Sequence, residues 1–278
     1  MDGSLMHHSA DKALMSADDR LDRRNSGLPR PVPRCSLLDP ERAKSSHDHI
    51  AAVLGTELLQ GRYPPGSTMP AEGKLGERFQ VSRTVLREVM KTLAAKGFLV
   101  PKTRVGTRVR DAVYWNYFDA DVLAWRLCLG LDDAFLETLT EIRRALEPAA
   151  AALAARRRDP DDVARLRECL RQIGRVDHSR QSFAAVDLDF HLAIGTASGN
   201  PLIRSIASVI ETALVASFTY SSPADDPGDH AASVAGHAAV VDAIEAGDGP
   251  RAARSILAVI NSGAQRIEQR KRRCRVPR

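Results

Sequence analysis

A carboxylate and two imidazoles in the second half of the chain have the types and spacing of metal ligands. Asp187 and His191 are four positions apart, so both side chains project from the same face of a helix. His237 lies on a later helical segment that could cross this face. One carboxylate with two imidazoles suits borderline divalent cations such as Zn²⁺, Ni²⁺ or Mn²⁺. The sequence therefore predicts a candidate metal site at these three residues, with a polar pocket without metal as the alternative.

The same three residues allow different functions. A catalytic ion would make the chain a metal-dependent hydrolase, but no nucleophile, general base or oxyanion motif accompanies the set. An ion that is itself the signal would make the chain a metal-responsive regulator. An organic acid bound beside the ion would make the site an effector pocket. We expect a binding protein and not an enzyme.

A second set of residues has the chemistry of nucleic-acid recognition. Residues 83–96 form a predicted helix, and its apolar positions Leu86, Val89, Met90 and Leu93 fall on one stripe. The opposite face is basic, and the planar fork of an arginine can donate two hydrogen bonds to guanine in the major groove. We expect DNA contacts from this helix and from the basic hairpin after it, at Ser82, Arg83, Thr84, Arg87, Lys91, Lys102, Arg104, Gly106 and Thr107.

The elements around this basic helix have the outline of a winged helix-turn-helix. A helix begins near Ser46 and ends at the Gly61 and Pro64–Pro65 breakers, and a short helix follows over 71–79. After the basic helix, the β-type residues of 98–109 flank a turn near Gly106, which predicts a hairpin. Three helices and one hairpin within 45–110 predict a DNA-binding domain.

The rest of the chain is predicted to be helical throughout, which makes the fold class mainly α. Gly and Pro breaks separate the predicted helices, and short loops favour an antiparallel all-α bundle over 111–269. The prolines and polar residues of 1–44 predict a disordered leader, and 270–278 a disordered basic tail. The predicted helices cover 117–129, 132–157, 160–175, 180–198, 201–220, 229–246 and 250–270.

The charge is distributed unevenly along the chain. Residues 1–110 hold 19 basic and 12 acidic residues, a net charge of +7, whereas 111–269 hold 15 and 23, a net charge of −8. Residues 270–278 add +6. The basic first part suits a polyphosphate partner, while the basic tail leaves open a protein that packages nucleic acid without sequence preference.

Composition also bears on the compartment. No apolar run approaches the ~20 residues needed to span a bilayer, so we expect no membrane partner. The N-terminus lacks the apolar core of a secretion signal, and the widely spaced cysteines contain no CxxC pair. The sequence predicts a cytoplasmic protein with reduced thiols.

The segment MPAEGKLGERFQVSRTVLREVMKTLAAKGFL, followed by RVGTRV, resembles the DNA-binding domain of the GntR family of bacterial regulators. The resemblance implies sequence-specific binding to duplex operator DNA. Members of the family often carry a DNA-contacting arginine directly after the Pro-x-Glu glutamate, and this chain has Gly73 there. The matching residues are Pro70, Glu72, Leu75, Val81, Ser82, Arg83, Thr84, Arg87, Glu88, Leu93, Gly97 and Gly106.

Three later segments, EIRRALEPAAAALAA, DLDFHLAIGTASGNPL and GHAAVVDAIEAGD, resemble the FadR-type ligand-binding domain of that family. The resemblance implies that Arg143 points into the pocket and binds an effector carboxylate. Asn200 follows Gly199, so we expect a turn residue first, with a contact to the effector as the alternative. It also implies a third metal-binding histidine on the last helix, where this chain has Ile260. Arg144 lies three positions before Glu147, so we expect these two to form a surface ion pair.

The segments WNYFDADVLAW and INSGAQRI resemble the sugar-acid-responsive members of the subfamily. Together these resemblances imply a repressor of an operon for a sugar acid or related carboxylate. A homodimer would place two recognition helices on a palindromic operator. A small carboxylate effector, with or without a divalent ion at Asp187, His191 and His237, would change its affinity for the operator.

Overall fold

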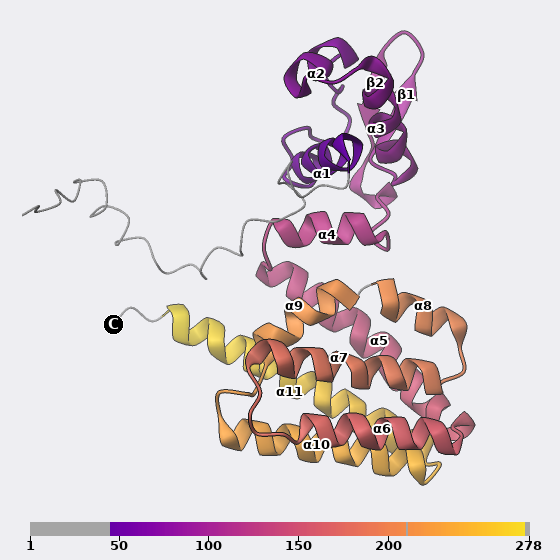
Figure 1. Cartoon of the computed structure of the whole chain (residues 1–278), viewed down its shortest axis with the longest axis vertical. Helices are drawn as coiled ribbons and strands as arrows, with labels where there is room; N and C mark the ends of the chain where they lie inside the picture. Colours follow the sequence, from indigo (N-terminus) through magenta and orange to yellow (C-terminus); the bar gives the residue numbers. More distant parts are fainter. Residues whose placement is uncertain (1–44, 210, 276–278) are drawn as a thin grey trace, which may run out of the picture.

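The computed structural model describes residues 45–209 and 211–275, so the predicted leader 1–44 lies outside the described residues (Figure 1). A small N-terminal part sits at one end of a larger helical bundle, as Figure 1 shows. The elements of the small part are α1 (Ser46–Leu59), α2 (Glu72–Phe79), α3 (Arg83–Ala95), β1 (Leu99–Lys102) and β2 (Gly106–Val109). These three helices and one hairpin confirm the predicted winged helix-turn-helix.

Local signals in the sequence account for how this part folds. The side chain of Ser82 caps α3 by accepting a hydrogen bond from the backbone N–H of Val85 at 3.3 Å. The stripe Leu86, Val89, Met90 and Leu93 is buried in the core between the three helices. β1 and β2 pair antiparallel and form the wing. The opposite face of α3 is thereby left in solvent.

Helix α4 (Ala120–Cys128) connects the winged part to the bundle and packs in the core of the winged part. Its Trp125 lies against Gly55 of α1, where even a β-carbon would be 2.1 Å from the indole ring. The ammonium group of Lys96, at the end of α3, lies 2.6 Å from a carboxylate oxygen of Asp119 and 2.8 Å from one of Asp121. These contacts fix α4 to the winged part.

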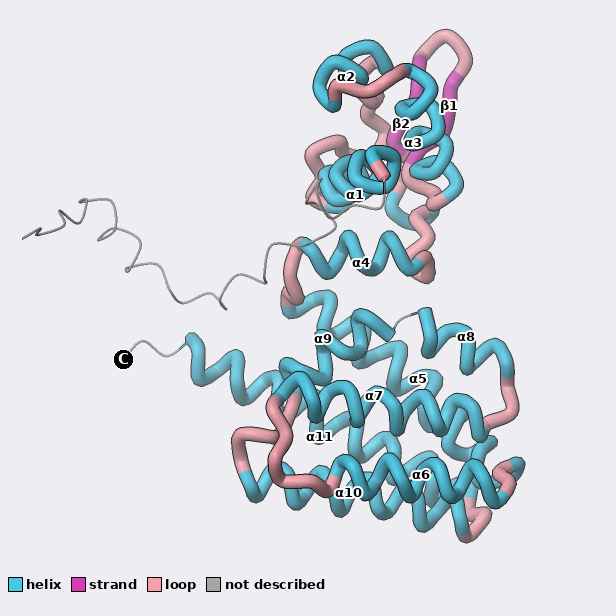
Figure 2. Tube along the Cα trace, viewed as in Figure 1, coloured by secondary structure: helices cyan, strands magenta, loops and turns pink. Residues whose placement is uncertain are grey.

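The bundle contains the long helices of the second half and confirms the predicted all-α architecture (Figure 2). Alanines on one side of α5, at 150, 151, 154 and 155, are buried and let neighbouring helices approach closely. The longest helix, α11, packs against both α5 and α10. The elements are α5 (Asp133–Arg157), α6 (Pro160–Ile173), α7 (Arg180–Ala197), α8 (Pro201–Val209), α9 (Glu211–Ser221), α10 (Pro227–Glu245) and α11 (Gly249–Arg275).

The predicted helix 201–220 corresponds to α8 and α9, which lie on either side of residue 210, itself outside the described residues. Two predictions about this half were wrong. The basic tail is helical as far as Arg275, because Arg270 donates hydrogen bonds to the carbonyls of Tyr220 and Ser222 and holds this end on the bundle. Cys169 is a free, buried thiol, as predicted, but Cys128 takes part in a disulfide. In the described part of the chain, the helices are too short or too polar to cross a membrane.

We predict that Gly55→Ala loosens the contact between α1 and α4. The new methyl group would displace the Trp125 ring, and such overpacking costs about 1–3 kcal/mol. Urea unfolding followed by tryptophan fluorescence measures the loss. Gly73→Ala is the matched control, because a β-carbon at Gly73 meets no atom within 4 Å and alanine favours a helix. A Gly55→Ala variant as stable as the unsubstituted protein would contradict the tight packing.

Candidate functional site

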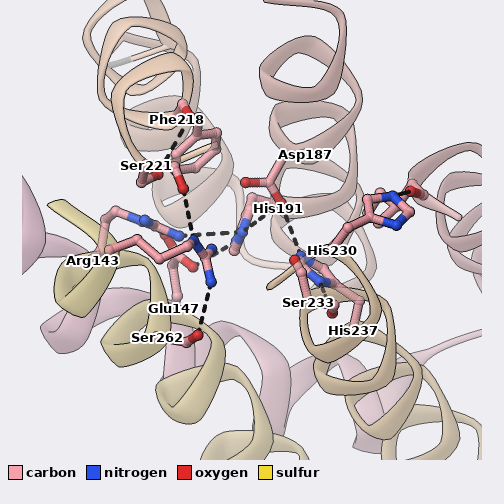
Figure 3. Close-up of polar contacts among 12 residues, drawn as sticks. Arg143, Glu147, Asp187, His191, Phe218, Ser221, His230, Ser233, His237 and Ser262 are labelled. Atoms are coloured by element: carbon pink, nitrogen blue, oxygen red, sulfur yellow. Dashed lines mark hydrogen bonds and ion pairs between the residues drawn. The ribbon is translucent and has the colours of Figure 1, made fainter. Parts of the chain in front are cut away.

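The structure brings the three predicted metal ligands together inside the bundle (Figure 3). Asp187 and His191 come from α7, and His237 comes from α10. The Asp187 Oδ1 atom lies 2.9 Å from His237 Nε2 and 3.7 Å from His191 Nε2. One ligand atom from each residue lies within 4.8 Å of the others. The two histidines are buried and the Asp187 side chain is 13% exposed, so this is a polar cluster inside an apolar bundle.

The outer nitrogen of each imidazole lies close to an oxygen atom, and that of His237 is within hydrogen-bond geometry of it. His237 Nδ1 lies 2.7 Å from the carbonyl oxygen of Ser233, and His191 Nδ1 lies 2.7 Å from Glu147 Oε2. If these nitrogens carry the protons, the Nε2 lone pair of His237 faces Asp187 at 2.9 Å, whereas His191 Nε2 lies 3.2 Å from the Nη2 donor of Arg143 and 3.7 Å from Asp187. A lone pair at 2.9 Å from a carboxylate oxygen is repulsive unless a cation lies between them. The arrangement therefore fits a divalent ion bound between His237 Nε2 and Asp187 Oδ1. A proton on His237 Nε2, which would donate a hydrogen bond to Asp187, is the alternative.

Arg143 joins this site from α5. Its Nε donates to Glu147 Oε1 at 2.6 Å, and its Nη2 lies 3.2 Å from His191 Nε2. The guanidinium also stacks on Phe218, with 4.4 Å between its central carbon and the ring centroid. Arg143 therefore points into the interior, as predicted.

The prediction that Arg144 pairs with Glu147 was wrong. Glu147 turns toward Arg143 and His191, and Arg144 donates to Asn261 Oδ1 at 2.9 Å instead. Glu147 is a further member of the site that was not predicted from the sequence. The spacing of four between Arg143 and Glu147 was the available signal.

The charges of this site are mutually stabilised. Burial would raise the pKa of Asp187, but the hydrogen bond and charge of His237, with the charges of His191 and Arg143, outweigh it and lower the pKa to about 2. Burial also opposes ionisation of Glu147, and the charges of Arg143 and His191 lower its pKa to about 2. Both carboxylates are therefore ionised at neutral pH and hold cationic groups in place.

Two other predicted positions lie apart from this polar cluster. Ile260 is buried in the apolar core of the bundle, so no third imidazole comes from that position of α11. Asn200 caps α8, where its Oδ1 accepts hydrogen bonds from the backbone of Leu202 and Ile203. The structure does not bring Asn200 together with Arg143.

A cavity adjoins the polar cluster between α5, α7, α8 and α9. Its polar walls are Arg143, Glu147 and His191. Asn200 is not among its lining residues. The other walls are mainly aliphatic, at Ile142, Leu146, Ala150, Leu192, Ile194, Ile203, Ile206, Ala207 and Leu214.

The predicted DNA-contacting residues lie on one exposed part of the winged domain. Ser82, Arg83, Thr84 and Arg87 are exposed around the start of α3, on the side away from its buried stripe. Lys91 is exposed and forms a surface ion pair with Glu88 at 2.7 Å.

The tip of the wing is also exposed. Lys102, Arg104 and Gly106 lie in solvent, and Thr107 is half-buried on β2. The turn brings the backbone of Arg104 and Gly106 to positive φ, +65° and +94°, and only glycine adopts that region without strain. The wing and α3 thus present basic side chains on adjacent elements.

Known proteins share both parts of this architecture. Residues 46–109 match the family described as bacterial regulatory proteins, gntR family, and residues 138–262 match the FCD domain. The galactonate operon transcriptional repressor of Escherichia coli K12 is 32% identical over 222 residues, which cover 80% of this chain and 96% of the repressor. The chain belongs to the GntR family.

Two further similarities agree with this GntR-family assignment. The uncharacterised HTH-type transcriptional regulator YieP of Escherichia coli K12 is 33% identical over 215 residues, 77% of this chain and 91% of YieP. A solved structure titled for Lar, which controls the agr system of Listeria monocytogenes, has a TM-score of 0.55 at 18% identity, covering 81% of this chain and 98% of that chain. The Lar structure supports the fold alone, and the sequence relatives make this chain a DNA-binding transcription regulator.

Proposed function

We propose that this GntR-family regulator represses an operon for a sugar acid or related carboxylate and leaves its operator when an acidic effector binds the bundle. The observation that carries the proposal is that one chain contains two sites. One is the exposed basic face of α3, and the other is a polar site inside the bundle with one guanidinium, one carboxylate and two imidazoles, from Arg143, Asp187, His191 and His237. The similarity to a galactonate operon repressor supports the class of effector.

On the DNA side, α3 enters the major groove and the wing contacts the adjoining backbone. Residues 45–110 carry 11 basic and 5 acidic residues, which favours binding to a polyanion. Arg83 and Arg87 are the base-reading candidates, because their side chains are exposed near the start of the helix. A homodimer presents two such helices to a palindromic duplex.

On the effector side, Arg143 donates to ligand oxygens from the wall of the cavity. A divalent ion, Zn²⁺, Ni²⁺ or Mn²⁺, would be held by Asp187, His191 and His237, and it would supply positive charge and open coordination positions. Because Ile260 occupies the place of a third histidine, those open positions are available to oxygens of the effector. This donor set suits a ligand-binding role, and the transcription regulators among the relatives favour it over hydrolysis.

We predict that Arg87→Ala weakens binding to the operator about 10- to 100-fold, the loss expected for one bidentate contact to guanine. The probe is a duplex that the unsubstituted protein selects from random sequences, and fluorescence anisotropy at several salt concentrations measures affinity. Arg171→Ala is the matched control, because Arg171 is an exposed arginine on the bundle. Equal affinities for the Arg87→Ala variant and the unsubstituted protein would remove α3 from the DNA interface.

We predict that the purified protein, incubated with Zn²⁺, Ni²⁺ or Mn²⁺ and dialysed, retains about one ion per chain and that Asp187→Ala abolishes retention. Mass spectrometry of the metals measures the content. His230→Ala is the control, since the His230 ring contacts the Ile173 carbonyl and lies outside the ligand cluster. Equal metal content in Asp187→Ala and the unsubstituted protein would rule out this site. If the ion alone changed operator affinity, the metal-responsive alternative would be favoured.

A further inference from the structure

One guanidinium, that of Arg126, bridges the two helices that join the winged domain to the bundle. Arg126 lies in the last turn of α4, and its side chain is 18% exposed. Its Nη1 donates to the carbonyl oxygen of Gly130 at 3.1 Å, and its Nη2 pairs with a carboxylate oxygen of Asp132. The same group stacks on Phe135, with 4.7 Å between its central carbon and the ring centroid. One side chain of α4 thus contacts the connecting loop, the N-cap and the first turn of α5.

Helix capping alone does not require this bridge. The end of α4 is closed by backbone hydrogen bonds from the N–H groups of Leu129 and Gly130. Asp132 caps α5 independently, because its Oδ1 accepts from the backbone N–H of Phe135 at 2.8 Å while Arg126 pairs with its Oδ2. Each helix end therefore has its own cap. What the guanidinium adds is a connection that fixes the angle between the two helices.

The loop between α4 and α5 has the features of a hinge. It consists of residues 129–132 and turns at Gly130, whose φ is +94°. Glycine adopts this region at little cost, whereas other residues are strained there. A β-carbon at Gly130 would meet no atom within 4 Å, so this side of the loop is open. The conformation of the loop therefore depends on the backbone at Gly130 and on the contacts of Arg126.

Helix α4 is held more firmly by the winged domain than by the bundle. It lies between the two parts in Figure 1. Of the three buried residues that the structure describes in α4, Val122 and Trp125 lie in the core of the winged domain and Leu123 lies in a core of the bundle. The ion pairs of Lys96 also fix α4 to the winged side. A change of angle at the loop would therefore turn α4 and the winged domain together.

We propose that Arg126 is a positioning residue for DNA recognition, which fixes the distance between the two recognition helices of the homodimer and so selects the spacing of the operator half-sites. This inference rests on the proposed function, which supplies the homodimer and the palindromic operator. A rigid dimer binds two half-sites tightly at one separation, because each added base pair moves a half-site along and around the duplex. A dimer without the bridge accepts several separations and loses the affinity that pre-organisation provides.

The test measures the preference for half-site spacing by fluorescence anisotropy. The duplexes carry the operator selected with the unsubstituted protein, with its half-sites moved apart or together by one base pair. Dithiothreitol is present, because Cys128 at the end of α4 takes part in a disulfide. The unsubstituted protein should bind the altered spacings about 30-fold or more weakly than the selected one. Arg126→Met should lose about 5- to 10-fold at the selected spacing and show a preference below about fivefold.

Arg144→Met is the matched control, since Arg144 is an exposed arginine of α5 that donates to Asn261, and it should keep the full preference. Gly130→Ala strains the same loop without removing the bridge, so it should relax the preference in the same direction. Circular dichroism checks the fold of each variant. Hydrogen–deuterium exchange of residues 129–136 measures the loop itself, and it should be about tenfold faster in Arg126→Met.

An unchanged spacing preference in a folded Arg126→Met variant would overturn the proposal. If Arg126→Met does not fold, an unchanged preference in Gly130→Ala would overturn it instead. Absence of any spacing preference in the unsubstituted protein would overturn both the palindromic dimer of the proposed function and the spacing role that rests on it. Unchanged exchange of the loop in Arg126→Met would overturn the bridge alone and leave the proposed function standing.

Discussion

Two adjacent residues of α4 lie in two different hydrophobic cores, one in the winged domain and one in the bundle. The connection between the two domains depends on this double packing of α4. Val122 packs in the core of the winged domain, together with Trp125, whereas Leu123 packs with Leu188, Leu214 and other residues of the bundle. The Lys96 ion pairs and the Gly55 contact fix α4 on the winged side. The short helix α4 therefore contacts both the DNA-binding part and the bundle surface around Leu123.

The same bundle surface touches the polar site. Phe218 lies in the cluster of Leu123, and its ring contacts both the guanidinium of Arg143 and the imidazole of His191, with 5.1 Å between the two ring centroids. Arg143 is held by Glu147, whose charge is itself stabilised within the site. Breaking a buried ion pair costs about 3–5 kcal/mol, and Phe218 packs directly on the Arg143 member of this pair. The site and the winged domain are thus linked through Phe218 and Leu123.

Much of this was available from the sequence, because the signals were local. The breakers, the cap at Ser82 and the stripe on α3 defined the winged domain, and the spacing of Asp187 and His191 located the cluster. Contacts between residues far apart in the sequence could not be predicted. The partner of Glu147 depends on how α5 and α7 face each other, since Arg143 and Arg144 are both within helical reach. The basic end of α11 has the composition of a solvated tail, and it is the carbonyls at and just after the end of α9 that hold Arg266 and Arg270 on the bundle.

The most direct test of this account is the effect of galactonate on operator affinity in Leu123→Ala, measured by anisotropy at a temperature where the variant is folded. Leu123 belongs neither to the predicted DNA-contacting residues nor to the cluster of Asp187, His191 and His237, so the variant should bind galactonate within about threefold of the unsubstituted protein. In the unsubstituted protein, galactonate should weaken operator binding about 100-fold, and in Leu123→Ala this effect should fall below about fivefold. An undiminished effect of galactonate in Leu123→Ala would contradict control of the winged domain through α4.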